Sequence, residues 1–574
     1  MKQIQGDHQM RLSDYKSVEP INKGWSNDKK YYVTKDDGAK YLLRIAAADQ
    51  YEKKKKEFEL MKQVEQLGVR MCQPVEVGIC EEGVFTLQTW IDGDDAERVI
   101  PLLSDTDQYV LGRKAGAILK KIHTIPAPST QEDWEIQFNR KIDKKIEGYN
   151  NCPIHYEDDG VLLSYIEEHR HLLKGRPQSF QHGDYHIGNM MIENGELTII
   201  DFDRYDYGDP WEEFNRIVWC AHHSPLFASG MVNGYFDDAP PMEFWKLLAL
   251  YIASNTLSSI YWAIPFGQGE IDIMRNQANE VLTWYDHMCN PVPTWYFTGY
   301  YLQEMDGLTY KLKASYDFGF LSRYGKVFKI FDDQDSGNIC FGTEKDGERY
   351  FIKFAGAQTE QYTGEPMDAI SRLRETVPIY QELKHINLIE FIKAEEVGGG
   401  FAMIFRWTDG ECMGRMYPLS RQKFLQMPVI TRMNVFDDIL SFFEFAVSKD
   451  YVVIDFYDGS ILYDFKNQKT TICDIDCFRK KPCVNDMGRM WGSSRFQAPE
   501  EYQLGATIDE ITNVYNLGAT AFALFSEYNR SRNAWPLDPK LYEVAVKAVS
   551  HDRNNRQQSI EEFRIDWETN RGSR

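Results

Sequence analysis

The chain lacks several features that would place it outside a reducing compartment. Its ten cysteines include no Cys-x-x-Cys pair and no cluster with histidine, which excludes the usual zinc sites and a disulfide framework. The first sixteen residues contain no apolar core, so we expect no signal peptide. These absences together predict a cytoplasmic protein.

Long apolar runs and positive charge are also scarce. The longest apolar stretch, residues 244–264, is interrupted by Lys246 and by several Ser, Thr and Asn residues, which favours a buried helix over a membrane span. Lys plus Arg number 65 against 87 for Asp plus Glu, giving a net charge of −22. We therefore expect no nucleic-acid or membrane partner and a mild preference for cationic substrates. A chain of 574 residues is too long for one core.

The stretch from His182 to Asp203 contains the strongest short hairpin signal in the sequence. Asn194-Gly195 stands between two apolar runs, 190–192 and 197–200, and this dipeptide favours a two-residue turn between paired strands. The turn would gather Asp184, Asn189 and Asp201 around one space. Asp184 can act as general base toward a hydroxyl, while Asn189 and Asp201 offer the hard oxygen ligands that suit Mg²⁺. The pattern predicts phosphoryl transfer.

These residues also carry a family resemblance. His182-Gly183-Asp184 with Asn189, followed by Ile200-Asp201 and Gly208-Asp209-Pro210, resembles the signature of the aminoglycoside phosphotransferase and choline kinase group. That resemblance implies a protein-kinase-like α+β fold with a small β-rich N-lobe and a larger helical C-lobe. It also implies ATP and Mg²⁺ as cofactors and a small hydroxylated molecule as acceptor.

The same resemblance suggests which residues bind the nucleotide. Strands are expected at 31–34 and 40–45, a helix at 51–67, and a further strand at 84–90. Arg44 falls where the family has a phosphate-binding Lys, and Glu57 is the candidate carboxylate that holds it, with Glu59 as the alternative. The run 53–56 is expected to be a solvated face. The full implied set comprises Ser26, Asn27, Arg44, Glu57, Gln88, Thr89 and Trp90.

Five carboxylates follow the hairpin and suggest an acceptor that carries an amine. A carboxylate close to a cation gains about 1 kcal/mol in water and about 4 at an effective dielectric of 20. The alternative for each is that it caps a helix or binds backbone. The five are Asp203, Asp206, Asp209, Glu212 and Glu213.

The second half of the chain repeats the landmarks of the first. A helix-breaking segment at 290–319 is expected to link a domain at 1–289 to another at 320–574. Lys353 lies six residues past Gly347, as Arg44 does past Gly38. Several landmarks in one order predict two copies of one fold, and hence two tandem bilobal kinase-like domains.

The second copy resembles eukaryotic-type Ser/Thr protein kinases, with departures from their motifs. Lys353 and Glu375, less securely Glu382, stand where those kinases have the phosphate-binding Lys and its helix partner, and Gly492 to Glu500 resembles the end of an activation segment, with Arg556 placed to pair with Glu500. The remaining implied site residues are Asp455 as base, Ser460 and Asp474 as metal ligands, and Arg406 and Trp407 at the hinge.

Three functions follow from these patterns. The first is an ATP- and Mg²⁺-dependent phosphotransferase whose N-terminal half phosphorylates a small hydroxylated, amine-containing molecule and whose C-terminal half is a Ser/Thr protein kinase with a protein substrate. In the second, the C-terminal half is a pseudokinase, a binding or regulatory module without transfer activity. In the third, the whole chain is a non-catalytic scaffold.

Overall fold

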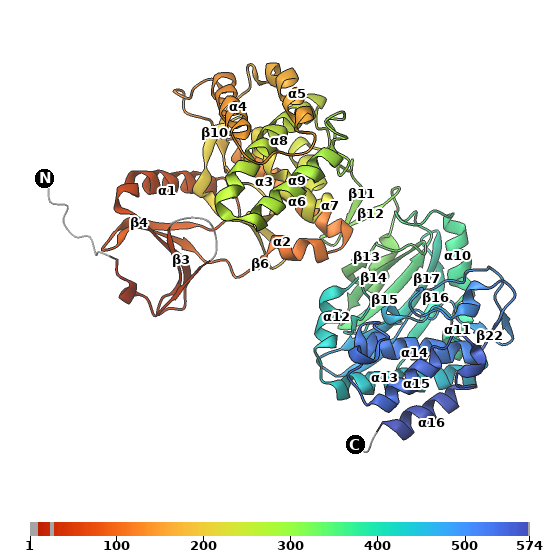
Figure 1. Ribbon diagram of the computed structural model, residues 1–574. Helices are drawn as coiled ribbons and strands as arrows, with labels where there is room; N and C mark the ends of the chain where they lie inside the picture. The colour runs from red at the N-terminus through yellow and green to blue at the C-terminus, as the bar shows by residue number, and fades with distance from the viewer. Residues whose placement is uncertain (1–9, 23–27, 572–574) are drawn as a thin grey trace. The chain divides into compact units, whose positions relative to one another are not determined.

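The computed structural model describes residues 10–22 and 28–571, and it divides into two compact units, Met1–Gly299 and Tyr300–Arg574 (Figure 1). The boundary lies inside the segment predicted to be a linker. Residues 300–319 belong to the second unit, where they form most of a β-hairpin whose Tyr310 and Leu312 are buried in a core. The aromatic side chains of this segment therefore build a domain and do not merely span between two.

The first unit opens with a five-stranded antiparallel sheet in the order β1-β2-β3-β5-β4, and α1 packs on β4 and β5. The predicted strands and helix are confirmed to within one or two residues. The elements are β1 (Ser17–Pro20), β2 (Lys29–Thr34), β3 (Lys40–Ala46), α1 (Tyr51–Gln66), β4 (Pro74–Cys80) and β5 (Gly83–Thr89).

Helices and two small sheets complete the first unit. The predicted hairpin is formed by β8 and β9, and its turn residues Asn194 and Gly195 both have positive φ, 54° and 77°, as a two-residue turn of this kind requires. The helices are α2 (Ala96–Val99), α3 (Asp105–Ile122), α4 (Trp134–Asn150), α5 (Asp159–His169), α6 (Ile217–His223), α7 (Pro225–Phe236), α8 (Met242–Ala263) and α9 (Gln268–Trp284). The sheets are β6 (Asp94–Asp95), β8 (Met190–Glu193) and β9 (Glu196–Ile199), and β7 (Ser179–Gln181) with β10 (Asp206–Gly208).

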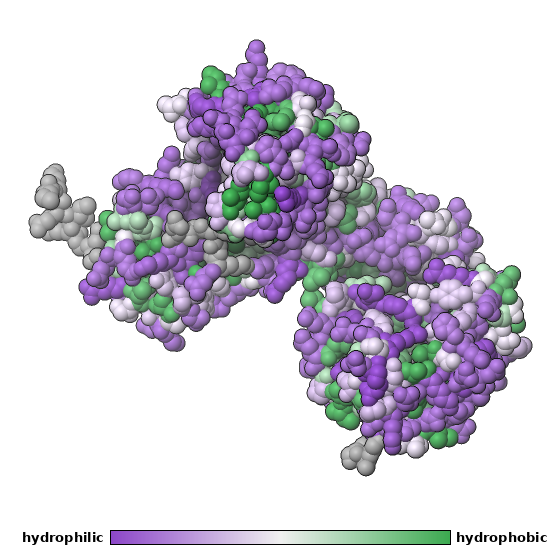
Figure 2. Space-filling model, viewed as in Figure 1, coloured by the Kyte–Doolittle hydropathy of each residue, from purple (hydrophilic) through white to green (hydrophobic). Residues whose placement is uncertain are grey.

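Among the described residues, one helix is long and apolar enough to cross a membrane, the stretch Met242–Phe266 that contains α8. It packs against α4, α5 and α9, and 67% of its most apolar window is buried. Such burial is typical of a core helix, as its interrupting polar residues predicted. The face of the molecule in Figure 2 is mainly hydrophilic, with small scattered apolar patches.

The second unit repeats the sheet order of the first. Its five strands run β13-β14-β15-β17-β16, all antiparallel, and a three-stranded sheet β18-β20-β21 corresponds to β6-β8-β9. Arg44 lies on the third strand of the first sheet and Lys353 on the third strand of the second. The two five-stranded sheets therefore share one strand order, with an arginine on the third strand of the first and a lysine on the third strand of the second.

The elements of the second unit are, in strands, β11 (Tyr301–Met305), β12 (Leu308–Leu312), β13 (Lys326–Phe331), β14 (Asn338–Lys345), β15 (Glu348–Ala355), β16 (Phe391–Val397), β17 (Gly400–Arg406), β18 (Glu411–Cys412), β19 (Tyr451–Val452), β20 (Ile461–Asp464), β21 (Lys469–Ile472), β22 (Arg479–Lys480), β23 (Cys483–Val484) and β24 (Thr507–Ile508). The helices are α10 (Pro366–Glu375), α11 (Val377–Glu382), α12 (Pro418–Leu425), α13 (Val429–Ser448), α14 (Glu510–Ser526), α15 (Pro539–Ala548) and α16 (Ile560–Asn570).

Candidate functional site

Two buried side chains hold the loop that presents Asp184. His182 donates from Nε2 to the carbonyl of Ile200 (3.0 Å) and accepts at Nδ1 from the amide of Asp184 (3.3 Å). Burial lowers the pKa of His182, so the ring is neutral and can play both roles. Glu213 accepts from the amide of Gly183 (2.9 Å). The sequence placed His182 in the motif but gave no signal for this use of Glu213.

Cations surround the carboxylate of Asp184. Nε of Arg216 lies 3.3 Å from Oδ1, Nη1 of Arg204 lies 3.7 Å from Oδ2, and Nε2 of His186 lies 3.7 Å from Oδ1. Burial alone would raise the pKa of Asp184, but the nearby His186 and the charges of the two arginines hold that pKa well below its ordinary range. Asp184 is therefore ionised at neutral pH, as a general base must be. Sequence reasoning assigned no task to His186 and overlooked both arginines.

Asn189 and Asp201 are tied to the same loop. Nδ2 of Asn189 donates to the backbone carbonyl of Asp184 (2.9 Å), and the amide of Ile200 donates to the backbone carbonyl of Asn189 (3.0 Å). Asp201 adopts positive φ, 65°, and its side chain is 42% exposed. The hairpin thus holds the three predicted residues in one continuous unit.

Arg44 and Lys54 form a buried cluster with four carboxylates. Arg44 pairs with Asp28, Asp201 and Asp203, while Nζ of Lys54 lies 2.9 Å from Asp28, 3.3 Å from Glu57 and 3.9 Å from Asp203. Both cations are nearly inaccessible to solvent. Two side chains from different elements therefore place positive charge beside Asp201.

This cluster corrects two predictions. Glu57, expected to hold Arg44, has Lys54 as its ion-pair partner among the described residues, and burial raises the pKa of Glu57. The run 53–56 is not wholly a solvated face, because Lys54 lies three residues before Glu57 and shares its inward side of α1. The alternative, Glu59, is exposed. Ser26 and Asn27 lie outside the described residues.

The predicted hinge amides are already used within the sheets of both units. The amide of Thr89 donates to the carbonyl of Gln73 (2.9 Å) and that of Trp90 to the carbonyl of Lys40 (3.1 Å). The corresponding amides of Arg406 and Trp407 donate to the carbonyls of Glu390 (2.8 Å) and Arg349 (3.1 Å). These four N–H groups therefore already have backbone partners. Gln88 is buried, and its Nε2 lies 3.6 Å from the sulfur of Met61.

The five carboxylates expected to attract an amine are all engaged within the unit. Asp209 is fully buried between Arg176 (2.7 Å) and the hydroxyl of Tyr251 (2.6 Å). The alternative that such groups cap helices or bind backbone holds for Asp206, Asp209 and Glu213, which accept from the backbone amides of Tyr207, Trp211 and Gly183. The other contacts are Asp203 with Arg44, Asp206 with Lys141 (3.3 Å), Glu212 with Gln181 (3.2 Å) and Asn215 (3.1 Å), and Glu213 with Gly183.

The sequence of this unit matches a known family over most of its length. Residues 17–245 match the phosphotransferase enzyme family, APH. This region is a domain of that family. This domain is therefore a kinase-type phosphotransferase that acts on hydroxyl groups. A comparison with curated proteins gave no match.

Several solved structures resemble the phosphotransferase domain at low identity. A thermostable mutant of aminoglycoside phosphotransferase APH(4)-Ia is 13% identical, with a TM-score of 0.37, and the match covers 47% of this chain and 96% of that one. Amicoumacin kinase hAmiN is 14% identical, with a TM-score of 0.36 and coverage of 50% and 92%. Aminoglycoside phosphotransferase APH(2'')-Ib is 17% identical, with a TM-score of 0.35 and coverage of 47% and 92%.

The residues of the phosphotransferase domain fit ATP and a divalent metal. Asp201 offers a partly exposed carboxylate, and Oδ1 of Asn189 accepts no hydrogen bond from the residues that the structure describes. Arg44 and Lys54 supply the positive charge that phosphate oxygens require. A bound metal would be held by Asn189 and Asp201 and would neutralise negative charge on the phosphate oxygens. The donor set is thus hard oxygen beside two cations, which is the chemistry such a complex needs.

Lys54 provides a first prediction. We expect Lys54→Gln to weaken ATP binding about 10-fold, equivalent to about 1.4 kcal/mol, because the variant removes a buried cation and leaves Glu57 without its partner. Titration calorimetry with ATP measures the effect. Lys55→Gln is the matched control, since Lys55 is exposed on the same helix. Equal ATP affinity in the two variants would contradict a role for Lys54 at the nucleotide.

In the second unit, Lys353 pairs with two aspartates that flank Ile475. Its Nζ lies 2.9 Å from Asp474 and 2.6 Å from Asp476. Burial alone would lower the pKa of Lys353, but the two carboxylates raise it well above its ordinary value. Sequence reasoning identified Asp474 and overlooked Asp476.

The predicted helix partner of Lys353 is wrong. Glu375 is exposed at the end of α10, and Glu382 pairs with Lys480 (2.6 Å). The hydroxyl of Tyr380, on α11, instead donates to Asp476 (2.8 Å). A break at Thr376 separates α10 from α11, which has Pro378 in its first turn, and brings a tyrosine, not a carboxylate, to this position.

Asp455 and Ser460 occupy contrasting environments. Burial and the charge of Asp474 raise the pKa of Asp455 to about 7, and its backbone adopts positive φ, 59°. Ser460 is fully buried, and its Oγ receives only a long contact, 3.5 Å, from the amide of Tyr457. The predicted base is thus partly protonated at neutral pH, and the predicted metal ligand is a single buried hydroxyl.

Two further contacts stabilise the second unit, and the first of them, between Arg556 and Glu500, was predicted from the sequence. Arg556 pairs with Glu500 through two hydrogen bonds (2.7 and 3.0 Å), and the arginine is fully buried. Asn513 accepts from the amide of Val453 (3.0 Å) and donates to its carbonyl (2.6 Å). Asn513 therefore fixes the strand that leads to Asp455.

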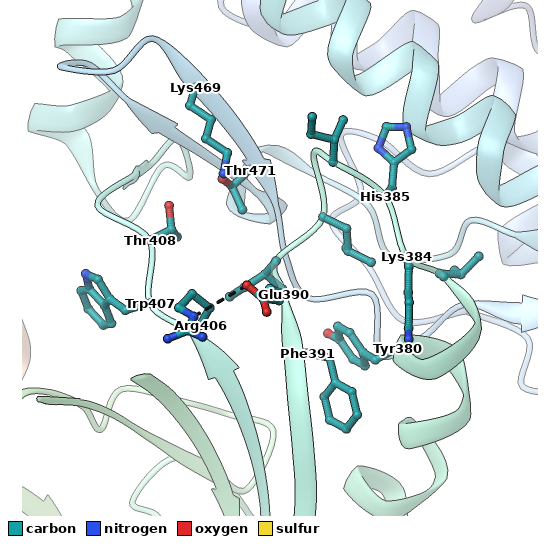
Figure 3. Close-up of a pocket in the computed structure, with 14 residues that line it drawn as sticks. Tyr380, Lys384, His385, Glu390, Phe391, Arg406, Trp407, Thr408, Lys469 and Thr471 are labelled. Carbon is teal, nitrogen blue, oxygen red and sulfur yellow. Dashed lines mark ion pairs between the residues drawn. The ribbon is translucent and has the colours of Figure 1, made fainter. Parts of the chain in front are cut away.

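A cavity of about 390 Å³ lies beside the second hinge (Figure 3). It is lined by Arg406 and Trp407 together with residues from the segment before β16 and from β21, and Arg406 pairs across it with Glu390 (3.7 Å). Lys353, Asp455 and Asp474 are not among its lining residues. The side chains of Arg406 and Trp407 therefore contribute to a cavity separate from the predicted phosphate site.

Proposed function

We propose that the phosphotransferase domain moves the γ-phosphoryl group of ATP to a hydroxyl of a small molecule, with Asp184 as general base. The observation that supports this most strongly is the ionised carboxylate of Asp184. Its loop is held by His182 and Glu213, which accept from the backbone amides of Asp184 and Gly183, and Asn189 joins the loop to the hairpin that ends in Asp201. Asp184 accepts the proton of the acceptor hydroxyl as its oxygen bonds to phosphorus and the bond to the ADP oxygen breaks.

Each remaining side chain of the site has a place in this reaction. Asn189 and Asp201 hold the metal, which we propose is Mg²⁺, and Arg44 and Lys54 hold phosphate oxygens. An amine-bearing, aminoglycoside-like acceptor stays a prediction. A cytoplasmic location and the lack of nucleic-acid and membrane partners also stay predictions.

An acceptor screen of the full chain tests the proposal. The protein is incubated with ATP, Mg²⁺ and hydroxyl compounds that include aminoglycosides, choline-like amines and sugars, and ADP release is followed. We expect at least one compound to raise ADP release well above the rate with water alone. Loss of that increase in Asp184→Asn, with ATP binding retained, would assign the activity to this site.

We also propose that the second unit has a second kinase-like fold. Its sheet order and its Lys353, Asp455 and Asp474 support this, as does the pairing of Arg556 with Glu500. If active, it phosphorylates Ser or Thr of a protein. The buried Ser460 and the capture of Lys353 by Asp474 and Asp476 favour the alternative of a pseudokinase that binds a nucleotide or partner without transfer.

Labelled ATP distinguishes the two alternatives in the full chain. The first site is silenced by Asp184→Asn, and transfer to the protein itself or to a general protein substrate is measured. Transfer that disappears in the double variant with Asp455→Asn indicates a kinase. Nucleotide binding without any transfer indicates a pseudokinase.

The raised pKa of Asp455 predicts a pH-dependent stability. The fold favours the protonated form of Asp455. Its contribution to stability is therefore complete below about pH 4, the pKa of this group in the unfolded chain, and is lost as the pH rises through about 7, its pKa in the folded chain. Asp455→Asn lacks this titration. We expect the variant to gain stability over the natural protein between pH 4 and 8, by about 1.4 kcal/mol for each unit of pKa difference.

Thermal unfolding of the second unit at pH 5 and pH 8 measures that gain. Asp346→Asn is the control, because Asp346 is an exposed turn residue with positive φ that Asn also adopts. A gain that is equal at both pH values would contradict the raised pKa.

A further inference from the structure

The cavity beside the second hinge has an aromatic wall that the fold holds in place. The rings of Tyr380 and Phe391 line it, with their centroids 6.1 Å apart and their planes inclined by 30°. The Tyr380 hydroxyl donates to Asp476 (2.8 Å) and accepts from the amide of Ile475 (3.2 Å), so this ring is fixed. The volume of about 390 Å³ is in the range of pockets that hold small molecules. A preformed aromatic wall in a cavity of this size suits a flat ring.

An apolar side chain of the cavity is left in water. Ile386 lines the cavity and is 82% exposed, whereas Leu383, Leu388 and Ile389, which line it too, are buried. A ligand with an apolar body would cover Ile386 and gain from the water that it displaces. The aliphatic lining therefore favours the same kind of ligand as the aromatic wall.

Thr471 adds a buried polar group that has no partner. It is 4% exposed and lines the cavity, and its hydroxyl makes no hydrogen bond to the residues that the structure describes. Lys469 lies two positions earlier on β21, so both side chains are on the same face of that strand (Figure 3). A hydroxyl can donate to a carboxylate or phosphate oxygen, and a buried polar group without a partner is unfavourable.

The cavity also has two lysines without counterions. Lys384 and Lys469 come from separate elements, and neither makes an ion pair within the described part of the chain (Figure 3). Arg406 already pairs with Glu390 (3.7 Å) and with Glu348. With histidine counted as neutral, the lining has three cations and one carboxylate, a formal charge of +2 in a chain of −22. A cleft of this sign attracts anions.

We propose that this cavity binds a small aromatic acid, a molecule with one flat ring system and a carboxylate or phosphate group. The ring lies against Tyr380 and Phe391. Lys384 and Lys469 bind the acid group, and the Thr471 hydroxyl donates to one of its oxygens. None of these five residues belongs to the predicted phosphate site of either unit. The inference therefore does not depend on phosphoryl transfer by either half of the chain.

Matched compounds that differ in charge test the site in the full chain. The set is 2-naphthoate, 2-naphthyl phosphate, 2-naphthylmethanol and 2-naphthylmethylamine, and titration calorimetry at neutral pH gives a Kd for each. We expect at least one anion to bind about 10-fold more tightly than the alcohol and the amine, and the two anions show which acid group is preferred. The inference is overturned if neither anion has a Kd below about 1 mM, or if the alcohol or amine binds as tightly.

Variants on β21 locate the binding. In Lys469→Gln the Kd of the preferred anion should rise about 5-fold, because one of the two cations that hold the acid group is lost, whereas Lys469→Arg should keep the affinity. Lys469 is exposed, so both variants should fold. Lys466→Gln is the matched control, because Lys466 is exposed in the turn of the same hairpin and does not line the cavity. Equal weakening in Lys469→Gln and Lys466→Gln, or none in either, would overturn the inference.

Thr471→Val separates a specific site from a general attraction of anions. The variant keeps the branched shape of the side chain and the charge of the cavity, and it removes only the donor. We expect the Kd of the preferred anion to rise about 5-fold and the Kd of 2-naphthylmethylamine to stay unchanged. Thermal unfolding confirms that the variant is folded. Unchanged anion affinity in folded Thr471→Val would contradict a site built on this hydroxyl.

Discussion

Replacing Asp184 with Asn is expected to lower kcat for phosphoryl transfer about 10²- to 10⁴-fold, the usual contribution of a positioned general base. The amide is close in size but cannot accept the hydroxyl proton. His182 and Glu213 hold the backbone of this loop through the amides of Asp184 and Gly183, so the fold of the loop should survive. Steady-state ADP release with an accepted substrate measures the loss.

The lowered pKa of Asp184 adds a second readout. The lowered pKa keeps the Asp184 carboxylate ionised throughout the usual assay range. The stability that its ion pairs with Arg204 and Arg216 contribute is lost only as the pH falls through this low pKa. We therefore expect no loss of rate from protonation of Asp184 between pH 5 and 8. Asp237→Asn is the control for Asp184→Asn and should leave the rate unchanged, because Asp237 is 80% exposed in a surface ion pair with Lys120. Full activity in Asp184→Asn would exclude Asp184 as the base.

Replacing Arg556 with Met is expected to destabilise the second unit by about 3 to 5 kcal/mol, because the substitution leaves Glu500 charged and buried without its main partner. Arg553 also contacts Glu500 (3.0 Å) but is partly exposed and pairs with Asp509. Removing both charges, in Glu500→Gln with Arg556→Met, should recover part of the loss. Differential scanning calorimetry or urea unfolding measures the change.

The matched control for Arg556 is Arg374→Met. Arg374 is half exposed and pairs with Glu396 at the surface, so its loss should change stability by no more than about 1 kcal/mol. Equal effects of the two substitutions would show that the Glu500–Arg556 pair contributes no more than an exposed one. A larger loss in the double variant than in Arg556→Met would also contradict the buried-charge explanation.

Local patterns in the sequence predicted the local structure well. A two-residue hairpin turn requires positive φ at two consecutive residues, which Asn194 and Gly195 adopt readily. These two residues were therefore enough to predict the hairpin of β8 and β9. The apolar spacing of α1 and the short apolar runs of β3 and β5 were similarly sufficient. These elements depend on neighbours in sequence, and the repeat of their order revealed the second unit.

Long-range ion pairing was predicted less well. Glu57 was assigned to Arg44, and Glu375 to Lys353, because each carboxylate stands on the expected helix. In the structure Glu57 pairs with Lys54, while Lys353 pairs with Asp476 as well as Asp474. A charged side chain has many possible partners at similar separation in sequence, and the selection depends on which of them the fold buries together.

The order of strands, the hairpin and the residue types at the phosphate site were determined by the sequence itself, since turn chemistry and hydrophobic periodicity act over a few residues. The folded chain alone decided how the charges are distributed around Asp184. It engages five acidic side chains internally and places Arg204 and Arg216 beside Asp184. The physical reason is that net charge is a sum over the whole chain, whereas a substrate responds to the few charges that burial leaves without counterions.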